Sequence, residues 1–240
     1  ALTRSRPSLA FIEQLAEEVE IRDLPVLRVG ANPAVMLNPV PKALNRFQSE
    51  QIRNRFTFRT GLVGEMVDAL TKGEIDCYIG QVDWTRVDAD AADMLKCRNL
   101  GHSGLSVGCA RDHPLLQKEV VRPEDLLSYP WISASEASSN WQAVSAQFRR
   151  RGLKPPVPTA TAGLIGILSI AADTECLFCG PDWVIDHRIT GGTLSRLDVE
   201  GFDLTRAAID FLSLIDPEPG TAMGDWLAAL EAEWPVVGVL

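Results

Sequence analysis

The fold is decided by residues 62–80, which read LVGEMVDALTKGEIDCYIG. Apolar side chains recur at helical spacing in the first half of this stretch, which predicts a helix with one apolar face. Lys72 and Gly73 then predict the end of that helix, because a left-handed glycine is the usual C-terminal cap. The apolar run at residues 75–80 predicts a buried strand.

The residues upstream repeat the same alternation of strand and helix. Residues 26–30 and 56–59 predict two strands. Between them, Asn38 predicts a helix N-cap, with Pro39 and Pro41 in the first turn, where a missing N–H costs nothing. Strand, helix, strand, helix and strand in this order imply right-handed crossovers and a parallel sheet.

A second α/β series follows a polar stretch, residues 83–93, which predicts a loop. Helix 164–172 is apolar nearly all round and is therefore expected to be buried. A further helix begins at Ser138 or Ser139 and ends at Gly152. The remaining expected elements are strands at 105–110, 131–133, 157–162, 176–179 and 194–199 and a helix at 182–189.

The end of the chain predicts one strand, 207–214, and one helix capped by Thr221, too few elements for a further lobe. The chain is therefore expected to return to its first half. The predicted fold class is α/β, with two Rossmann-like lobes of mainly parallel sheets joined by two crossover hinges. Lobe I is expected at residues 24–100 and 207–240 and lobe II at 101–206. The hinge residues are then Gly101, Gly104, Leu204 and Thr205.

Residues 1–23 form a segment of a different kind. Leu9, Ile12, Ala16 and Val19 fall at heptad-like spacing within residues 8–22, which predicts a short amphipathic helix. A surface helix and an intersubunit linker are equally good interpretations of this pattern.

Composition and charge limit the function. The formal net charge is −9, whereas a duplex-binding module normally carries a basic surface. Any DNA-reading part is therefore expected outside these 240 residues. No apolar run approaches the length that a membrane span requires, so no membrane partner is expected.

The five cysteines, an odd number in apolar contexts, favour reduced thiols in a cytoplasmic protein. Cys176 and Cys179 spell C-x-x-C, but within a strand their side chains point to opposite faces. Buried core is favoured there over redox sensing. The three histidines, His102, His113 and His187, show no metal-ligand spacing. Neither a metal nor a cofactor is expected.

In the order of its motifs the chain resembles the effector-binding domain of LysR-type transcription regulators, from about Leu27 to Trp234. The matching segments are 27–30 (LRVG), 37–39 (LNP) with Phe47, 70–80 (LTKGEIDCYIG), 111–115 (RDHPL), 125–127 (DLL) and 131–132 (WI). The resemblance implies a periplasmic-binding-protein type 2 fold and a small effector between the lobes. It also implies a homodimer or homotetramer, with DNA bound through an N-terminal helix-turn-helix outside this chain.

Ligands of open α/β sheets bind beyond the carboxyl ends of strands, where helix N-termini point free N–H groups. This rule selects twelve candidate effector-binding residues. An ordinary capping or turn role is the alternative for Asn32 and the serines, and a solvent-facing position on its strand is the alternative for Arg59. They are Asn32, Pro33, Arg59, Thr60, Gly61, Leu62, Val63, Gln81, Ser133, Ser135, Gly163 and Leu164. By the resemblance, Gln81 stands where some family members place a basic contact. Its neutral amide argues against a strongly charged effector. The alternative is that Arg59, and not residue 81, pairs with the charge of the effector.

Two other function classes remain as alternatives. The first is an extracytoplasmic solute-binding protein of a transporter, which the cysteines and the early amphipathic helix disfavour. The second is an enzyme on this fold, which needs a convergent set of acid, base or nucleophile that the sequence does not display. Gly101-His102-Ser103-Gly104 lacks the closing glycine of a nucleophile elbow, and Arg149, Arg150 and Arg151 fit the end of a helix. A non-enzymatic sensor is therefore expected.

Overall fold

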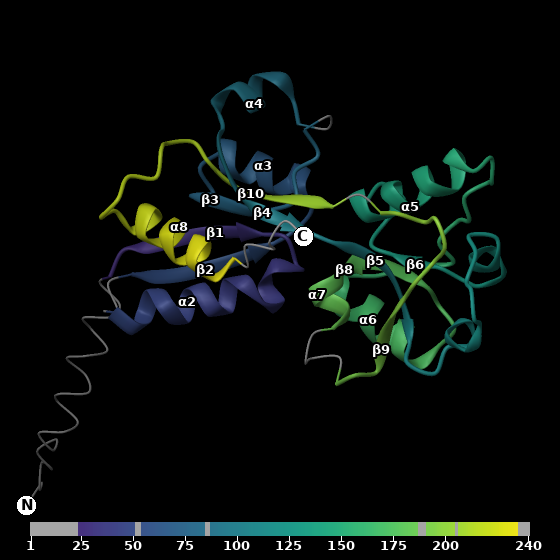
Figure 1. Cartoon of the computed structure of the whole chain (residues 1–240). Helices are drawn as coiled ribbons and strands as arrows, with labels where there is room; N and C mark the ends of the chain where they lie inside the picture. Colours follow the sequence, from purple (N-terminus) through teal and green to yellow (C-terminus); the bar gives the residue numbers. More distant parts are fainter. Residues whose placement is uncertain (1–23, 51–53, 85–86, 187–190, 205, 235–240) are drawn as a thin grey trace, which may run out of the picture.

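The computed structural model describes residues 24–50, 54–84, 87–186, 191–204 and 206–234, which form two α/β halves (Figure 1). The expected helix within residues 1–23, the hinge residue Thr205 and residues 235–240 lie outside this part of the chain. No helix within the described ranges has the length and apolar character needed to cross a membrane.

The first half is built on a five-stranded sheet of order β2-β1-β3-β10-β4. Its strands are β1 (Val26–Ala31), β2 (Arg55–Thr60), β3 (Cys77–Gly80), β4 (Lys96–Ser103) and β10 (Ala207–Ser213). β1 pairs in parallel with β2 and β3, whereas β10 is antiparallel to both β3 and β4. The last strand of the chain therefore completes the first sheet.

Helices cover both faces of this sheet. These are η1 (Val35–Leu37), α2 (Pro39–Glu50), α3 (Val63–Thr71), α4 (Ala89–Met94) and α8 (Ala222–Glu233). α2 and α8 pack on one face against Cys77, Ile79 and Phe211, and α3 packs on the other against Tyr78 and Leu212. Because neighbouring strand residues face opposite sides, a central strand buried on both faces is a continuous apolar run.

Asp76, at the start of β3, ties the most specific sequence motif to β1. Its carboxylate accepts hydrogen bonds from the Arg28 backbone N–H at 2.7 Å and from Arg28 Nη2 at 2.5 Å. Its own N–H donates to the Arg28 carbonyl at 2.7 Å. Asp76 thus sets the register at which β3 meets β1, which explains why an acid precedes the buried strand.

The second half contains two smaller sheets, ordered β8-β5-β9 and β6-β7. Its strands are β5 (Leu105–Ala110), β6 (Ile132–Ser133), β7 (Ala160–Thr161), β8 (Phe178–Pro181) and β9 (Leu194–Leu197). Its helices are η3 (Pro114–Gln117), η4 (Asp125–Ser128), α5 (Ser139–Arg150), α6 (Leu164–Asp173) and α7 (Asp182–Ile185). β6 and β7 are parallel, but β5 is antiparallel to both of its neighbours.

The antiparallel pairs depart from the expectation of mainly parallel sheets, and they share one cause. β5 carries the chain into the second half and β10 brings it back into the first. β10 runs in the opposite direction to β3, and β5 runs in the opposite direction to β8 and β9, so these pairs are antiparallel. The α/β class and the two-lobed architecture are as expected.

Several local expectations were wrong. The strand expected at 157–162 is only Ala160–Thr161, and the strand expected at 176–179 is Phe178–Pro181. The stretch 83–93 is not a continuous loop, because Asp88 caps α4 by accepting from the N–H groups of Asp90 and Ala91. None of the residues of α4 is buried, so the helix has no apolar stripe that the sequence could reveal. α6 is not buried all round: Ile165 and Ile170 are 59% and 37% exposed, because the buried face of α6 is the one that carries Ile167, Leu168 and Ala171.

The chain passes between the halves on strands that pair with each other. Gly104 alone separates β4 from β5, and Arg206 directly precedes β10, which pairs with β4. Gly101 has φ +149°, and a Cβ there would collide with the Trp234 indole. At this crossing the backbone conformation and the available space both demand glycine.

We predict that the returning strand carries much of the stability of the first half. Ile209 is 4% exposed and packs in the core with Trp226, so Ile209→Ala should lower the free energy of unfolding by about 2–5 kcal/mol. Ile215→Ala is the matched control, because Ile215 is 67% exposed, and should change it by less than about 0.5 kcal/mol. Urea denaturation measures both, and equal effects would contradict the packing of β10.

Gly101→Ala should destabilise the protein more than Gly152→Ala. Gly152 has φ +71° with no neighbour near an added Cβ, so its substitution should cost about 1–2 kcal/mol of backbone strain. Gly101→Ala adds the collision with Trp234, for a further ~1–3 kcal/mol. Thermal unfolding of the two variants gives the comparison. Equal losses of stability would mean that the Trp234 side chain moves aside without cost.

Candidate functional site

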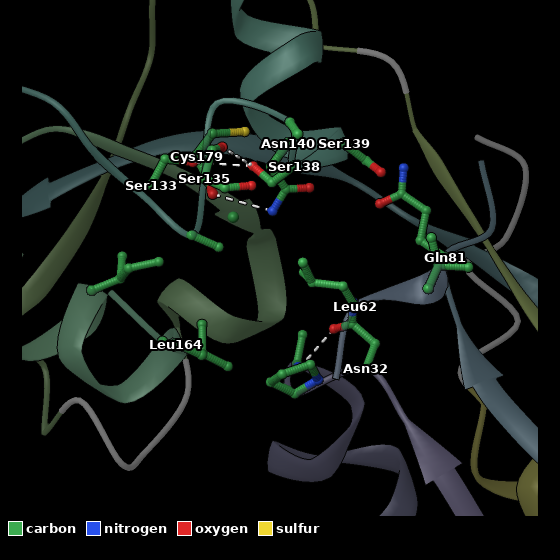
Figure 2. Close-up of a pocket in the computed structure, with 18 of the residues that line it drawn as sticks. Asn32, Leu62, Gln81, Ser133, Ser135, Ser138, Ser139, Asn140, Leu164 and Cys179 are labelled. Carbon is green, nitrogen blue, oxygen red and sulfur yellow. Dashed lines mark hydrogen bonds between the residues drawn. The ribbon is translucent and has the colours of Figure 1, made fainter. Parts of the chain in front are cut away.

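A cavity of about 670 Å³ lies between the halves, where strands of both end (Figure 2). The first half lines it with residues 32–34 after β1, 61–65 after β2 and Gln81 after β3. The second half contributes residues 133–135 and 137–140 after β6, 162–164 and Ile167 after β7, and 178–181 of β8. The carboxyl ends of β1, β2, β3, β6 and β7 thus converge on one gap.

Ten of the twelve candidate residues line this cavity. They are Asn32, Pro33, Gly61, Leu62, Val63, Gln81, Ser133, Ser135, Gly163 and Leu164. In Figure 2, Asn32, Leu62 and Gln81 of the first half lie across the gap from the serines of the second. The rule that ligands bind at the carboxyl edge of a sheet therefore selected residues that do lie together.

Arg59 and Thr60 do not line the cavity. Arg59 Nη1 forms an ion pair with Glu74 Oε2 at 2.7 Å, and both side chains are half-exposed. β2 is an edge strand, and the turn toward the cavity begins only at Gly61. Arg59 is thus engaged elsewhere and does not supply the expected charge partner. Among the described residues, the cavity lining contains no lysine, arginine or histidine.

Several lining residues were not among the candidates. They include Ser138, Ser139 and Asn140 at the start of α5, Glu65 in α3 and the whole of β8. The N-cap serine before α5 was a usable signal, since the helix that follows a strand starts at the same sheet edge. No sequence signal points to β8, because its place depends on its antiparallel pairing with β5.

Three of the longer helices, α3, α5 and α6, begin at the cavity and differ in how their N-termini are capped. Ser138 Oγ accepts from Trp141 N and caps α5. Leu62 and Gly163, the N-cap residues of α3 and α6, provide no side-chain cap. The first-turn N–H groups of these two helices therefore receive no side-chain cap, and at α6, whose first turn has no acidic residue, the helix dipole also favours negative charge.

The polar side chains in the cavity divide into engaged and free groups. Asn32 Oδ1 accepts from Ala34 N at 2.8 Å, which leaves the amide nitrogen of Asn32 to donate. The Ser133 hydroxyl is engaged by the Ser135 carbonyl at 3.2 Å and the Ser138 hydroxyl at 3.1 Å. Asn140 Nδ2 donates to the Cys179 carbonyl at 3.3 Å. Ser133 and Asn140 therefore shape the wall.

Cys179 is a half-buried thiol in the cavity wall, and Cys176 is buried in the core behind it. Burial raises the pKa of the Cys179 thiol to about 12, and the nearby charge of Asp182 acts in the same direction. The thiolate, which is the nucleophilic form, is thus scarce at neutral pH. Both thiols are free, but Cys176 lies before β8 and Cys179 reaches the cavity, so the buried-core interpretation of this C-x-x-C holds for Cys176 only.

Within the described ranges, the lining contains neither a metal-binding cluster nor a histidine. No group of three or more His, Cys, Asp or Glu side chains in these ranges is arranged to hold a metal. His113 is buried away from the cavity, with Nδ1 accepting from Leu115 N at 3.1 Å and Nε2 3.2 Å from the Glu175 carbonyl. The geometry is that of a binding site with neutral donors and apolar walls.

Comparison with known proteins gives a consistent family. Residues 23–235 match the family model described as "LysR substrate binding domain". The uncharacterized HTH-type transcriptional regulator YdcI of Escherichia coli is 26% identical over 179 residues, which are 73% of this chain and 56% of YdcI. The chain spans about half the length of the curated relatives it matches.

Two solved structures show the same fold. One is the CcmR regulatory domain of Synechocystis PCC6803 in complex with 2-PG, with TM-score 0.73, 17% identity and coverage of 90% of this chain and 100% of that one. The other is the BenM effector binding domain with its effector benzoate, with TM-score 0.65, 18% identity and coverage of 87% and 91%.

We predict that Cys179 resists alkylation although it faces the cavity. At pH 8 iodoacetamide should modify Cys97 faster than Cys179. The pKa of Cys97 is raised to about 11, below that of Cys179, so a larger fraction of Cys97 is thiolate, and Cys97 is also the more exposed side chain. Both rates should rise with pH as thiolate accumulates. Mass spectrometry of the wild type and Cys179→Ser assigns the modified sites. Rapid labelling of Cys179 at pH 7 would reveal an activated thiol.

Proposed function

The chain belongs to the family of LysR substrate binding domains, and from this membership we propose that it senses a small effector for a LysR-type transcription regulator. The observation that carries the proposal is the family match over residues 23–235 together with a cavity formed by both halves. The effector is bound in that cavity, and DNA is read by a helix-turn-helix outside these 240 residues. The net charge of −9 supports this division of labour.

The cavity favours a small polar or anionic effector. The uncapped N-termini of α3 and α6 supply backbone donors, and Asn32 and Gln81 supply side-chain amides. Leu62, Leu164 and Phe178 provide apolar surface for the rest of the molecule. BenM, whose effector is benzoate, shares this fold and supports the choice of a small molecule.

The signal is a shift between open and closed arrangements of the halves. A ligand that contacts both walls stabilises the closed arrangement only by its difference in affinity for the two states. A coupling free energy of about 1–3 kcal/mol is typical and sufficient for regulation. Closure about Gly101, Gly104 and Leu204 then alters how the subunits of a homodimer or homotetramer face each other, and with them the DNA-reading domains.

The two alternative functions are less well supported. The family match favours a regulator over the solute-binding protein of a transporter. An enzyme needs a convergent acid, base or nucleophile, whereas the described lining offers one carboxylate, on Glu65, and the protonated thiol of Cys179. We therefore propose a non-enzymatic sensor that acts in the cytoplasm.

A thermal-shift screen with a cleft-filling variant tests the proposal. An effector among small carboxylates, phenols, amino acids or sugars should stabilise the chain by about 2.7 kcal/mol at 100 times its dissociation constant. Ala134→Trp, at an exposed position in the lining, should abolish this stabilisation by filling the cavity. Ala228→Trp, on the exposed side of α8, is the matched control and should retain it.

Two outcomes would contradict the proposed function. The cavity would not be the effector site if Ala134→Trp bound as tightly as the wild type. The signalling mechanism would be wrong if the full-length regulator gave identical scattering curves and DNA footprints with and without a bound effector.

A further inference from the structure

Glu65 is the one residue in the described lining that carries a formal charge. It has no hydrogen-bond or ion-pair partner among the described residues. Its side chain folds back over Gly61, where an added Cβ would lie 2.8 Å from Glu65 Oε2. Gly61 therefore leaves room at the cavity wall for this carboxylate, which is exposed and meets no cationic side chain among the described residues.

The charge of Glu65 makes the two sides of the cavity electrostatically different. Glu65 lies in the first turn of α3, so the positive end of that helix dipole already faces a carboxylate. The first turn of α6 has no acidic residue and no side-chain cap. An anionic group of a ligand is therefore repelled near α3 and attracted near α6. Within the lining, the α3 end therefore favours positive charge and the α6 end negative charge.

Neutral donors and acceptors extend both sides. On the first half, the Gln81 amide has no partner within the described ranges, and neither does the amide nitrogen of Asn32. On the second half, the hydroxyl of Ser139, the first residue of α5, is likewise unengaged within those ranges. The cavity thus offers both ends of a dipolar ligand hydrogen bonds in addition to the charge difference.

We infer that the effector is a zwitterion of the amino-acid class, an inference that rests on the proposed function. Its carboxylate accepts from the N-terminus of α6 and from Ser139. Its protonated amine faces Glu65 on the first half, beside Asn32 and Gln81. Its side chain packs between the apolar walls. Closure removes water from the amine–Glu65 pair, which strengthens their attraction, so the charged ends both orient the ligand and favour the closed state.

Matched ligand series test this inference directly. Leucine is compared by calorimetry with 2-hydroxy-4-methylpentanoate and with 4-methylpentanoate, which share its carboxylate and side chain. The same comparison is made for phenylalanine and for serine with their hydroxy and unsubstituted acids. In at least one series the amino acid should bind about tenfold or more tightly than both analogues, since a hydrogen bond between charged groups is lost in them.

The Glu65→Gln variant identifies the group that reads the amine. It should weaken binding of the amino acid about tenfold or more and leave the unsubstituted acid unchanged or bound more tightly, because repulsion of anions falls with the lost charge. Glu231→Gln, on the exposed side of α8, makes the same change in net charge far from the cavity and should alter neither affinity.

The failures of this inference and of the proposed function are distinguishable. The zwitterion assignment is overturned if the unsubstituted acid binds as tightly as the amino acid, if Glu65→Gln weakens all three ligands equally, or if no amino acid binds. In each case a phenol, sugar or simple carboxylate whose binding Ala134→Trp abolishes would leave the proposed function standing. Binding of any of these ligands that survives Ala134→Trp would overturn both.

Discussion

The structure depends on the pairing of β4 with β10, the two strands on which the chain leaves its first half and returns to it. Their register runs from Ala207 opposite Ser103 to Ser213 opposite Lys96. Because the crossing strands are hydrogen-bonded neighbours, the two passages of the chain between the halves lie side by side. α7 joins the same region, since Trp183 Nε1 donates to Ser103 Oγ at 2.9 Å and Asp182 N to the Gly104 carbonyl at 3.1 Å.

The position of the cavity follows from this arrangement. Strands that start within each half end at the gap, so the loops after them and the first turns of α3, α5 and α6 face each other across it. The resulting surface presents backbone donors, amides, hydroxyls and, among the described residues, a single carboxylate. In the proposed sensor, the uneven distribution of charge between the α3 and α6 ends is the feature that would orient a bound molecule.

Some polar residues at the site form hydrogen bonds within the cavity wall, and others have groups that are free to bind a ligand. Ser133 and Ser138 bond to each other and to the Ser135 carbonyl, which holds the turn between β6 and α5. Asn140 bonds to the β8 backbone, and the high pKa of Cys179 keeps its thiol neutral. What remains for recognition on the first half is the amide nitrogen of Asn32, the amide of Gln81 and the carboxylate of Glu65. Engaged groups hold the free ones in place.

The sequence by itself determined features that depend on neighbouring residues. Local pattern predicted the end of α3 at Lys72 and Gly73 and the caps Ser138 and Thr221. The order and number of the elements predicted the return of the last strand and helix. The expected strand ends predicted ten of the residues that line the cavity. Only the tertiary structure decided the antiparallel pairing of β5, the entry of β8 into the wall and the ion pair that removes Arg59 from the site. It also decided that Ile165 and Ile170 of α6 are exposed, which their apolar character had argued against. Capping and periodicity are set within one or two turns of chain, whereas strand direction, ion pairs and burial depend on segments distant in the sequence.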